Sequence, residues 1–517
     1  MMAPLIVAVG TIGASVWIAC EQQRSSALPD TGWRPLLGAA GRTMLISGIA
    51  ATISGVVGAC VVLSVFAIRS TALRRVMFAA AVVPALVPPA VTATVLQRLG
   101  SAALIVAASV VAMPYAVIGQ TLALRYCDVH AYLAARDLGL SRWRTWQVSA
   151  APVWRFGAGA AWVWGVFLIS SDPTIYQLLS GNRSFLPSHT LRAVLGGAPT
   201  SQMARVLTLY LVPACALAAI AVFLARRTRA TMRESHDVYR IADLVKARWL
   251  IWGSGAVTVA AYGFIAYEIV RLAVAAAQTF PIDFAAMVRD LAPTVLLVVV
   301  VLPLSTLFGT VLALAVYRAP RVVRTFGWWL IFFMMFAAPP AVGAVLAMGF
   351  RTSIAVGPFV LPALVGGSAV FGGKIALVIA AMSVCVPVTA MLVLAVRSTQ
   401  QGQIHAAARD LGATAIRSTF QVEGPALMPI VAIALCVEAS LVLTYAAPVT
   451  FVQPVGVSVA ASRIATLATT GFADEALAFS VLTGTLVALC MAWVYAVVRS
   501  TFAVSWFRTE PYRRKHG

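Results

Sequence analysis

Long apolar runs alternate with short polar segments along the whole chain. Runs such as 3–20, 44–68 and 295–317 contain no charged residue, and each is about as long as a helix that crosses the hydrocarbon core of a bilayer. The runs lack the alternation typical of barrel strands. The pattern therefore predicts an all-α integral membrane protein with about twelve transmembrane helices. The expected spans are 3–20, 44–68, 77–97, 101–124, 155–175, 204–225, 249–275, 292–317, 326–350, 372–396, 430–450 and 477–503.

Composition supports this class, because 61% of the 517 residues are hydrophobic and only 11% are charged. A soluble fold of this composition would have too little polar surface to cover itself, so lipid is the expected solvent. The net charge of +21 comes from basic residues in short loops between the runs. They form no aromatic-interleaved patch, so we expect no nucleic-acid partner. The seven cysteines are scattered and lack ligand spacing, so neither a disulfide framework nor a metal site is predicted.

The distribution of Lys and Arg predicts the orientation in the membrane. Basic residues gather in alternate loops, while acidic residues such as Asp30, Asp283 and Asp474 fall in the loops between them. Loops rich in Lys and Arg remain on the cytoplasmic side. We therefore expect a multi-pass protein of the cell (plasma) membrane with both termini in the cytoplasm.

The chain divides near its middle, at the charge-dense segment 226–248. This segment is the expected cytoplasmic linker between a first half, 1–225, and a second half, 249–517. Motifs of the first half recur in the second, at one constant offset and then at a larger one, which places an insertion between Pro340 and Pro387. At the first offset, Thr43, Gly58 and Pro88-Pro89 reappear as Thr294, Gly309 and Pro339-Pro340. At the second offset, Pro114, Ala134 to Gly139 and Pro152 reappear as Pro387, Ala407 to Gly412 and Pro425. Two parallel repeats of six helices are predicted.

One motif lies in a long cytoplasmic loop of each half, between the expected fourth and fifth spans. The hexapeptide AARDLG occupies residues 134–139 and again 407–412, with a Pro at the same distance after it in both copies. The small alanines and the glycine favour a short helix that ends in a sharp turn. We expect a compact helix-turn-helix in front of the next span. An ordinary amphipathic connector is the simpler alternative.

These paired loops resemble the EAA loops of the membrane permeases of binding-protein-dependent ABC importers. The resemblance covers about 41–225 and 292–503, and two loops in one chain resemble the fused branch that serves ferric iron, thiamine and similar solutes. It implies a type I importer fold, a cytoplasmic ATP-binding subunit homodimer and an extracytoplasmic solute-binding protein as partners. The implied coupling residues are Ala134, Ala135, Arg136, Asp137, Gly139, Ala407, Ala408, Arg409, Asp410 and Gly412. The family's acidic first position is occupied by Leu133 and Ala406.

Two acidic residues stand out inside expected spans, where a buried charge is costly and often functional. Glu438 and Asp172 are therefore candidates for the translocation path, and a structural hydrogen bond is the alternative role for Glu438. An ion-coupled secondary transporter with Glu438 as the coupling carboxylate is the alternative function. The sequence near Gly373-Lys374 does not form a phosphate loop, since Ile375 stands where Ser or Thr must bind magnesium. We expect no cofactor and no enzymatic activity in the chain itself, so ATP hydrolysis would occur on partner subunits.

Overall fold

The computed structural model describes most of the chain between residues 33 and 501. The described ranges are 33–68, 71–125, 134–180, 185–195, 200–228, 248–279, 284–337, 339–351, 353–356, 359–366, 369–399, 412, 414, 424–445, 447–454 and 457–501. The expected first span 3–20, most of the linker 226–248 and both termini lie outside the described residues.

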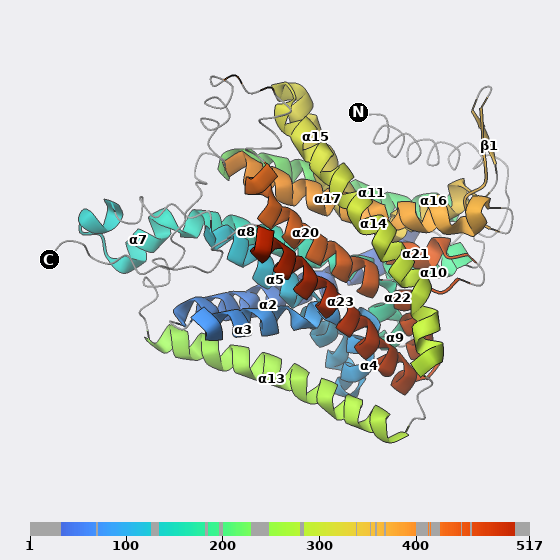
Figure 1. The fold of residues 1–517 in the computed structure, drawn as a ribbon, viewed down its shortest axis with the longest axis horizontal. Helices are drawn as coiled ribbons and strands as arrows, with labels where there is room; N and C mark the ends of the chain where they lie inside the picture. The colour runs from blue at the N-terminus through green and yellow to red at the C-terminus, as the bar shows by residue number, and fades with distance from the viewer. Residues whose placement is uncertain are drawn as a thin grey trace.

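Before the linker, α-helices and two 3₁₀ helices (η) form the described structure (Figure 1). They are α2 Trp33–Ala67, α3 Thr71–Val82, η2 Val83–Leu86, α4 Pro89–Leu96, η3 Gln97–Ala102, α5 Ala103–Arg125, α7 Arg142–Ser149, α8 Ala151–Ser171, α9 Pro173–Leu179, α10 Leu186–Leu195 and α11 Thr200–Thr228.

After the linker, helices again dominate, with one short hairpin between them. The elements are α13 Arg248–Thr279, α14 Phe284–Arg318, α15 Arg321–Phe336, α16 Pro339–Gly349, β1 Ile354–Val356, β2 Phe359–Leu361, η5 Val370–Gly373, α17 Lys374–Thr399, α20 Gly424–Thr444, α21 Ala447–Val452, α22 Ala460–Thr469 and α23 Ala473–Thr501.

Several of these helices are long and apolar enough to cross a membrane. Five meet this criterion among the described residues, or six if the bent pair α15 and α16 counts as one span. A helix satisfies its backbone hydrogen bonds internally, which lipid requires of any spanning segment. The expectation of a helical, multi-pass membrane protein is confirmed. The expected number of twelve spans exceeds the number that the described residues establish.

Four expected spans are broken rather than continuous. The segment 77–97 divides into α3, η2 and α4, and 326–350 divides into α15 and α16, which meet at 87°. The breaks before α4 and before α16 lie at the proline pairs, and η2 begins next to Pro84. Proline lacks an N–H and disfavours a helical conformation in the residue before it, so the helix ends there. The segments 155–175 and 430–450 also break, after Ser171 and after Thr444.

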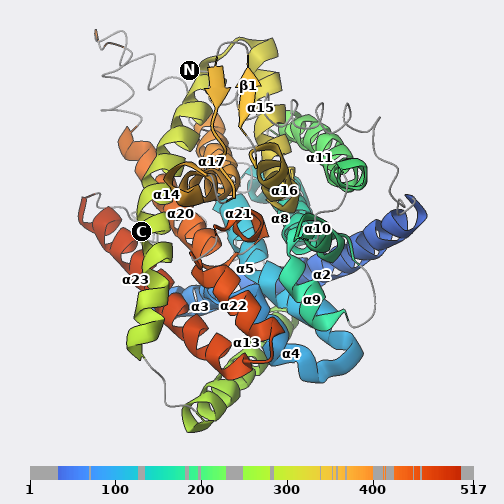
Figure 2. The same cartoon turned by 90° about the vertical axis from the view of Figure 1, so that its right-hand side faces the viewer.

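The β-hairpin is the one described departure from the expected helices. Its strands pair antiparallel, with Ile354 opposite Leu361 and Val356 opposite Phe359. It lies between Pro340 and Pro387, the interval in which the sequence predicts an insertion. Figure 1 shows it projecting beyond the helices, at the opposite end of the long axis from α7, and in Figure 2, which faces that end, it lies above α16.

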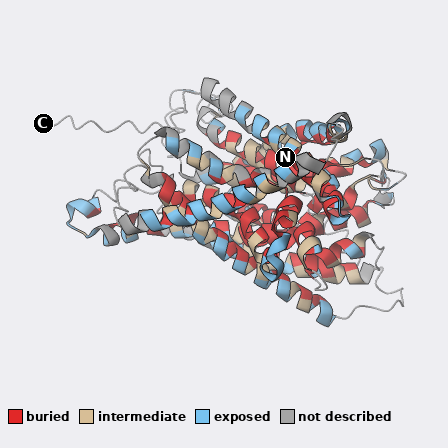
Figure 3. Cartoon of the chain, turned by 90° about the horizontal axis from the view of Figure 1, so that it is seen from below, coloured by how far each residue is buried: buried red, intermediate tan, exposed pale blue. Residues whose placement is uncertain are grey.

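Small residues allow the helices of the core to approach closely. An added Cβ at Gly165 of α8 would lie 3.3 Å from the Cβ of Ala51 on α2 and 3.5 Å from that of Ala112 on α5. Such contacts are typical of helix packing in membranes, where dispersion replaces the hydrophobic effect. Buried residues accordingly gather in the middle of the bundle and exposed residues on its outer helices (Figure 3).

Candidate functional site

The first AARDLG loop contains the turn expected at its glycine. Residues 134–137 are helical, and Gly139 has a φ of +76°, in the left-handed region that favours glycine. The Leu140 N–H donates to the carbonyl of Ala135 at 3.1 Å, and the Gly139 N–H donates to the carbonyl of Arg136 at 3.0 Å. This pair of bonds defines the Schellman motif that ends a helix.

A second helix follows the turn, so the loop is a helix-turn-helix. Ser141 begins α7, and its side chain accepts a hydrogen bond from the Arg144 N–H at 3.5 Å. The Trp146 ring packs edge-on against Trp154 of α8, with centroids 5.7 Å apart. Pro152 lies in the first turn of α8, where its missing N–H has no helical partner to lose. The loop is therefore anchored to the helix that it precedes.

The turn presents an exposed surface with one apolar side chain among charged ones. Arg136 and Asp137 are exposed, while Ala135 is buried against the loop. Leu138 is 82% exposed. The Arg136 side chain donates to the carbonyl of Leu140 at 3.4 Å. An exposed leucine beside charged groups can dock on another protein, since the apolar side chain supplies area and the charges supply orientation.

Only the glycine of the second AARDLG loop lies in the described part of the chain. Gly412 has a φ of +81°, close to the value at Gly139. Ala407, Ala408, Arg409 and Asp410 lie outside the described residues, as do Leu133 and Ala406.

Glu438 is fully buried in α20 and accepts hydrogen bonds from three hydroxyl groups. Ser305 donates at 2.6 Å and Thr306 at 3.1 Å, both from α14, and Thr389 donates from α17. Hydrogen bonds compensate the desolvation of a buried polar group. The carboxyl group thus joins three helices of the second half. This geometry fits the structural alternative for Glu438.

Asp172 lies at the junction between α8 and α9 and caps α9. Its carboxylate accepts from the Thr174 N–H at 2.8 Å and from the Thr174 hydroxyl at 2.5 Å. Capping satisfies backbone donors at a helix start and favours an acidic residue. Asp172 and Glu438 therefore belong to separate hydrogen-bond networks, and the structure does not bring them together in one site.

A small cavity lies between helices of the two halves, and Ser171, the residue before Asp172, lines it. Its space of about 20 Å³ holds roughly one water molecule. Ser171, at the end of α8, hydrogen-bonds to the Tyr445 hydroxyl, which follows α20, at 2.5 Å. The wall combines aromatic, thioether and hydroxyl groups. The lining residues are Trp164, Phe167, Leu168, Ser171, Met334, Met335, Ala337, Pro339, Ser383, Val384, Leu441 and Tyr445.

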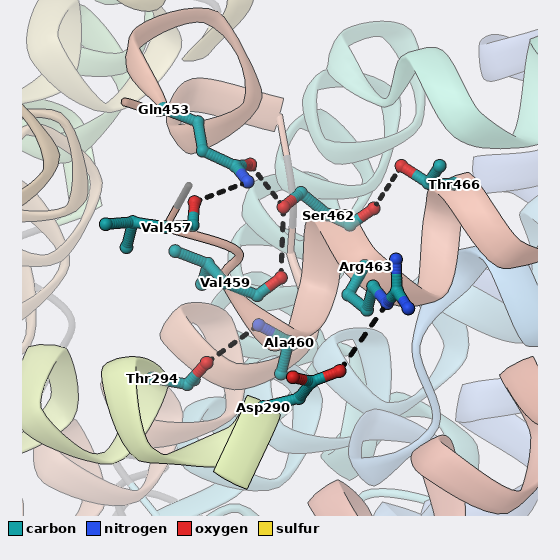
Figure 4. Close-up of polar contacts among 9 residues, drawn as sticks. All are labelled: Asp290, Thr294, Gln453, Val457, Val459, Ala460, Ser462, Arg463 and Thr466. Atoms are coloured by element: carbon teal, nitrogen blue, oxygen red, sulfur yellow. Dashed lines mark hydrogen bonds and ion pairs between the residues drawn. The ribbon is translucent and has the colours of Figure 1, made fainter. Parts of the chain in front are cut away.

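A polar network joins α14 to α22 and the loop before it (Figure 4). Thr294 of α14 accepts from the Ala460 N–H at 2.7 Å, and Asp290 lies 3.7 Å from the Arg463 guanidinium. Ser462 hydrogen-bonds to Gln453. The Asp290–Arg463 pair is 43% exposed on both sides, so it contributes little to stability. The network instead fixes where α22 begins.

The sequence did not single out Tyr445, Ser305 or Thr389. Hydroxyl side chains within apolar runs are common, because they can bond to their own helix backbone. Only the approach of α14 and α17 to α20 reveals which hydroxyls face Glu438. The cavity depends likewise on the break after Thr444, which turns Tyr445 toward Ser171.

We compared the chain with protein-family models, with curated proteins and with solved structures, and none of them matches it.

Proposed function

We propose that this chain is the membrane permease of an ATP-driven importer, built from two parallel copies of a six-span unit. Small solutes such as ferric iron or thiamine would arrive on an extracytoplasmic binding protein. A homodimer of cytoplasmic ATP-binding subunits would supply the energy through the two AARDLG loops. The observation that carries the proposal is the exposed turn at Gly139, whose left-handed glycine recurs at Gly412.

Helix boundaries support the two-copy organisation. Helices α2 and α14 end at Ala67 and Arg318, which are separated by the same offset as Thr43 and Thr294. Helices α8 and α20 end at Ser171 and Thr444, which are separated by the same offset as Pro114 and Pro387. The helices therefore recur with the two offsets of the sequence motifs.

The contacts of the recurring threonines give independent support. Thr43 of α2 accepts from the Leu186 N–H at 3.0 Å, at the start of α10. Thr294 of α14 accepts from the Ala460 N–H at 2.7 Å, at the start of α22. Helices α10 and α22 both contain ten residues. In each half, a threonine on the long helix thus accepts from the first residue of an equivalent later helix, α10 or α22.

The recurring glycines also make equivalent contacts. An added Cβ on Gly58 would lie 3.1 Å from the Cβ of Ala116, and one on Gly309 would lie 2.7 Å from the Cβ of Thr389. Ala116 and Thr389 are separated by the same offset as the first residues of α8 and α20. Gly58 therefore allows α2 and α5 to approach closely, and Gly309 allows the same for the equivalent pair, α14 and α17.

The experiment is affinity purification of the full chain from membranes that also contain the cell's ATP-binding subunits. We expect one chain to retain two ATPase protomers, as measured by native mass spectrometry. Leu138→Asp should weaken this association, because it places a charge on the exposed apolar group of the loop. Val360→Asp is the matched control, since Val360 is 67% exposed on the hairpin at the opposite end.

A chain that transports solute with no ATPase bound or required would overturn the proposal. Transport that follows an imposed proton or sodium gradient would instead favour the ion-coupled alternative, with Glu438 as its carboxylate. If the Leu138→Asp and Val360→Asp variants retain the ATPase equally well, this loop is not the docking surface.

A further inference from the structure

The β-hairpin belongs to a long uncharged segment between α16 and α17. Residues 352–373 contain no charged residue, and Arg351 and Lys374 flank them. The two strands read IAV and FVL, so every residue in them is apolar. Two isolated strands bury too little surface to be stable in water, and an exposed apolar strand tends to associate with another surface. The hairpin therefore needs a surface to lie on.

The base of the hairpin is fixed to the bundle. The N–H groups of Leu364 and Val365 donate to the carbonyl of Phe350 at 2.9 Å and 3.1 Å. Both side chains pack against a buried cluster from α14, α16 and α17. Val360, on the second strand, is instead 67% exposed. The bundle thus sets the level of the hairpin along α17 and leaves its strands uncovered.

This level is an edge of the membrane. The apolar stretch Phe371–Ala395 is long enough to cross a bilayer, so a span begins where the hairpin segment ends. Phe371 is 76% exposed and has a φ of +52°, which a bulky residue rarely adopts. Aromatic residues are enriched at the edges of a bilayer. Arg351 and Lys374 are exposed as well, and basic groups beside apolar ones are typical of segments that lie in the headgroup layer.

The direction of the strands favours lipid over a partner in the water phase. In Figure 1 they run across the direction of α17, and Figure 2, which faces that end of the bundle, again shows them along their length. A segment that reaches a soluble partner would extend away from the membrane, in the direction of the spans. The strands extend sideways instead, parallel to the membrane surface.

The pairing of the strands divides the hairpin into two faces. Successive residues of a strand belong to opposite faces, and paired residues share one. Positions 355 and 360 therefore form one face, and positions 354, 356, 359 and 361 form the other. The first face has Ala and Val, whereas the second has Ile, Val, Phe and Leu. The second, which we call the large-residue face, gains more free energy on leaving water.

We propose that the hairpin lies on the membrane surface at the end of the bundle opposite α7. The large-residue face contacts lipid and Val360 faces water. Phe371, Arg351 and Lys374 hold the base of the hairpin among anionic headgroups. The strand edges have unpaired backbone groups, which hydrocarbon does not tolerate, so the hairpin stays at headgroup level, where water satisfies them. The inference requires only a chain that spans the membrane and does not rest on the ATPase.

Spin labels on the second strand test the proposal in the full chain. Phe359→Cys, Val360→Cys and Leu361→Cys are made one at a time in a cysteine-free background, and each labelled chain is placed in nanodiscs of phosphatidylcholine and phosphatidylglycerol. Collisions with oxygen report lipid, and collisions with a water-soluble nickel chelate report water. Labels at Val299 of the spanning helix α14 and at Val148 of α7 are the lipid and water controls, since both residues are 63% exposed.

The ratio of oxygen to nickel accessibility should alternate along the strand. Labels at 359 and 361 should shift toward the value at Val299, whereas the label at 360 should match Val148. Values like that of Val148 at all three positions would overturn the proposal. Protection from the nickel chelate that arises only when a soluble binding protein is added would assign the hairpin to that protein and would also overturn it.

A charge variant tests the headgroup contact separately. Arg351→Gln with Lys374→Gln should shift the labels at 359 and 361 toward water in the same nanodiscs. Arg318→Gln with Arg321→Gln, between α14 and α15, is the matched control and should leave them unchanged. If both double variants have the same effect, Arg351 and Lys374 do not bind the headgroups and their assigned role is wrong.

Discussion

Replacement of Gly139 by valine tests the proposed coupling role of the first AARDLG loop through its backbone alone. An added Cβ at this position would meet no atom within 4 Å, so the substitution creates no steric clash. Its φ of +76°, however, lies in a region that a β-branched residue rarely adopts. Gly139→Val should therefore disturb the turn and leave the packing of the spans intact.

The expected magnitude follows from the cost of the left-handed conformation. This cost is about 1–3 kcal/mol for a non-glycine residue, which lowers the population of the native turn by about 5- to 150-fold. Transport and solute-stimulated ATP hydrolysis should fall together within this range, because both would depend on the same mechanical contact. Gly412→Val should act in the same direction, since Gly412 has a φ of +81°.

The assay measures both rates in proteoliposomes that contain the chain together with the proposed ATPase and binding protein. Gly139→Asn is the rescue variant, because asparagine tolerates the left-handed region, and it should retain most of the activity. Gly159→Val is the matched control. Gly159 is an exposed residue within α8 and also has no neighbour within 4 Å. A Gly139→Val, Gly412→Val double variant that folds, binds the ATPase and transports at the normal rate would refute the reasoning.

Three further predictions concern stability and orientation. Glu438→Ala should lower the free energy of unfolding by about 2–4 kcal/mol, because it removes an acceptor shared by two buried hydroxyls and one half-buried hydroxyl, whereas Glu438→Gln should cost less; unchanged thermal unfolding in detergent would contradict this. Gly309→Ala should cost about 1–3 kcal/mol and more than Gly58→Ala, since its Cβ contact is 2.7 Å rather than 3.1 Å, and the same unfolding measurement ranks them. Single cysteines at Val148 of α7 and Val360 of the hairpin, both exposed, should react with impermeant maleimide from opposite sides of the membrane; labelling of both from one side would exclude the proposed orientation.

The helical membrane class could be predicted from the sequence, because an apolar run of spanning length has few alternatives in lipid. The turn at Gly139 could also be predicted, since glycine after a short helix signals a left-handed C-cap. The proline pairs indicated breaks near residues 88 and 339. Their consequence was not predictable from local sequence, because the angle between α15 and α16 depends on what each helix packs against.

Tertiary structure alone assigned roles to the two buried carboxyl groups. Their sequence contexts are similar, each within an apolar run, yet Asp172 caps the next helix and Glu438 joins hydroxyls from α14 and α17. The hydroxyl partners of Glu438 lie 133, 132 and 49 positions away, and local periodicity carries no information about such contacts. The packing of α13 on α2, where the Ser64 hydroxyl donates to that of Ser254, is of the same kind. An apolar run in the sequence indicates that its helix must pack against apolar surroundings. Only the folded bundle determines which helix it packs against.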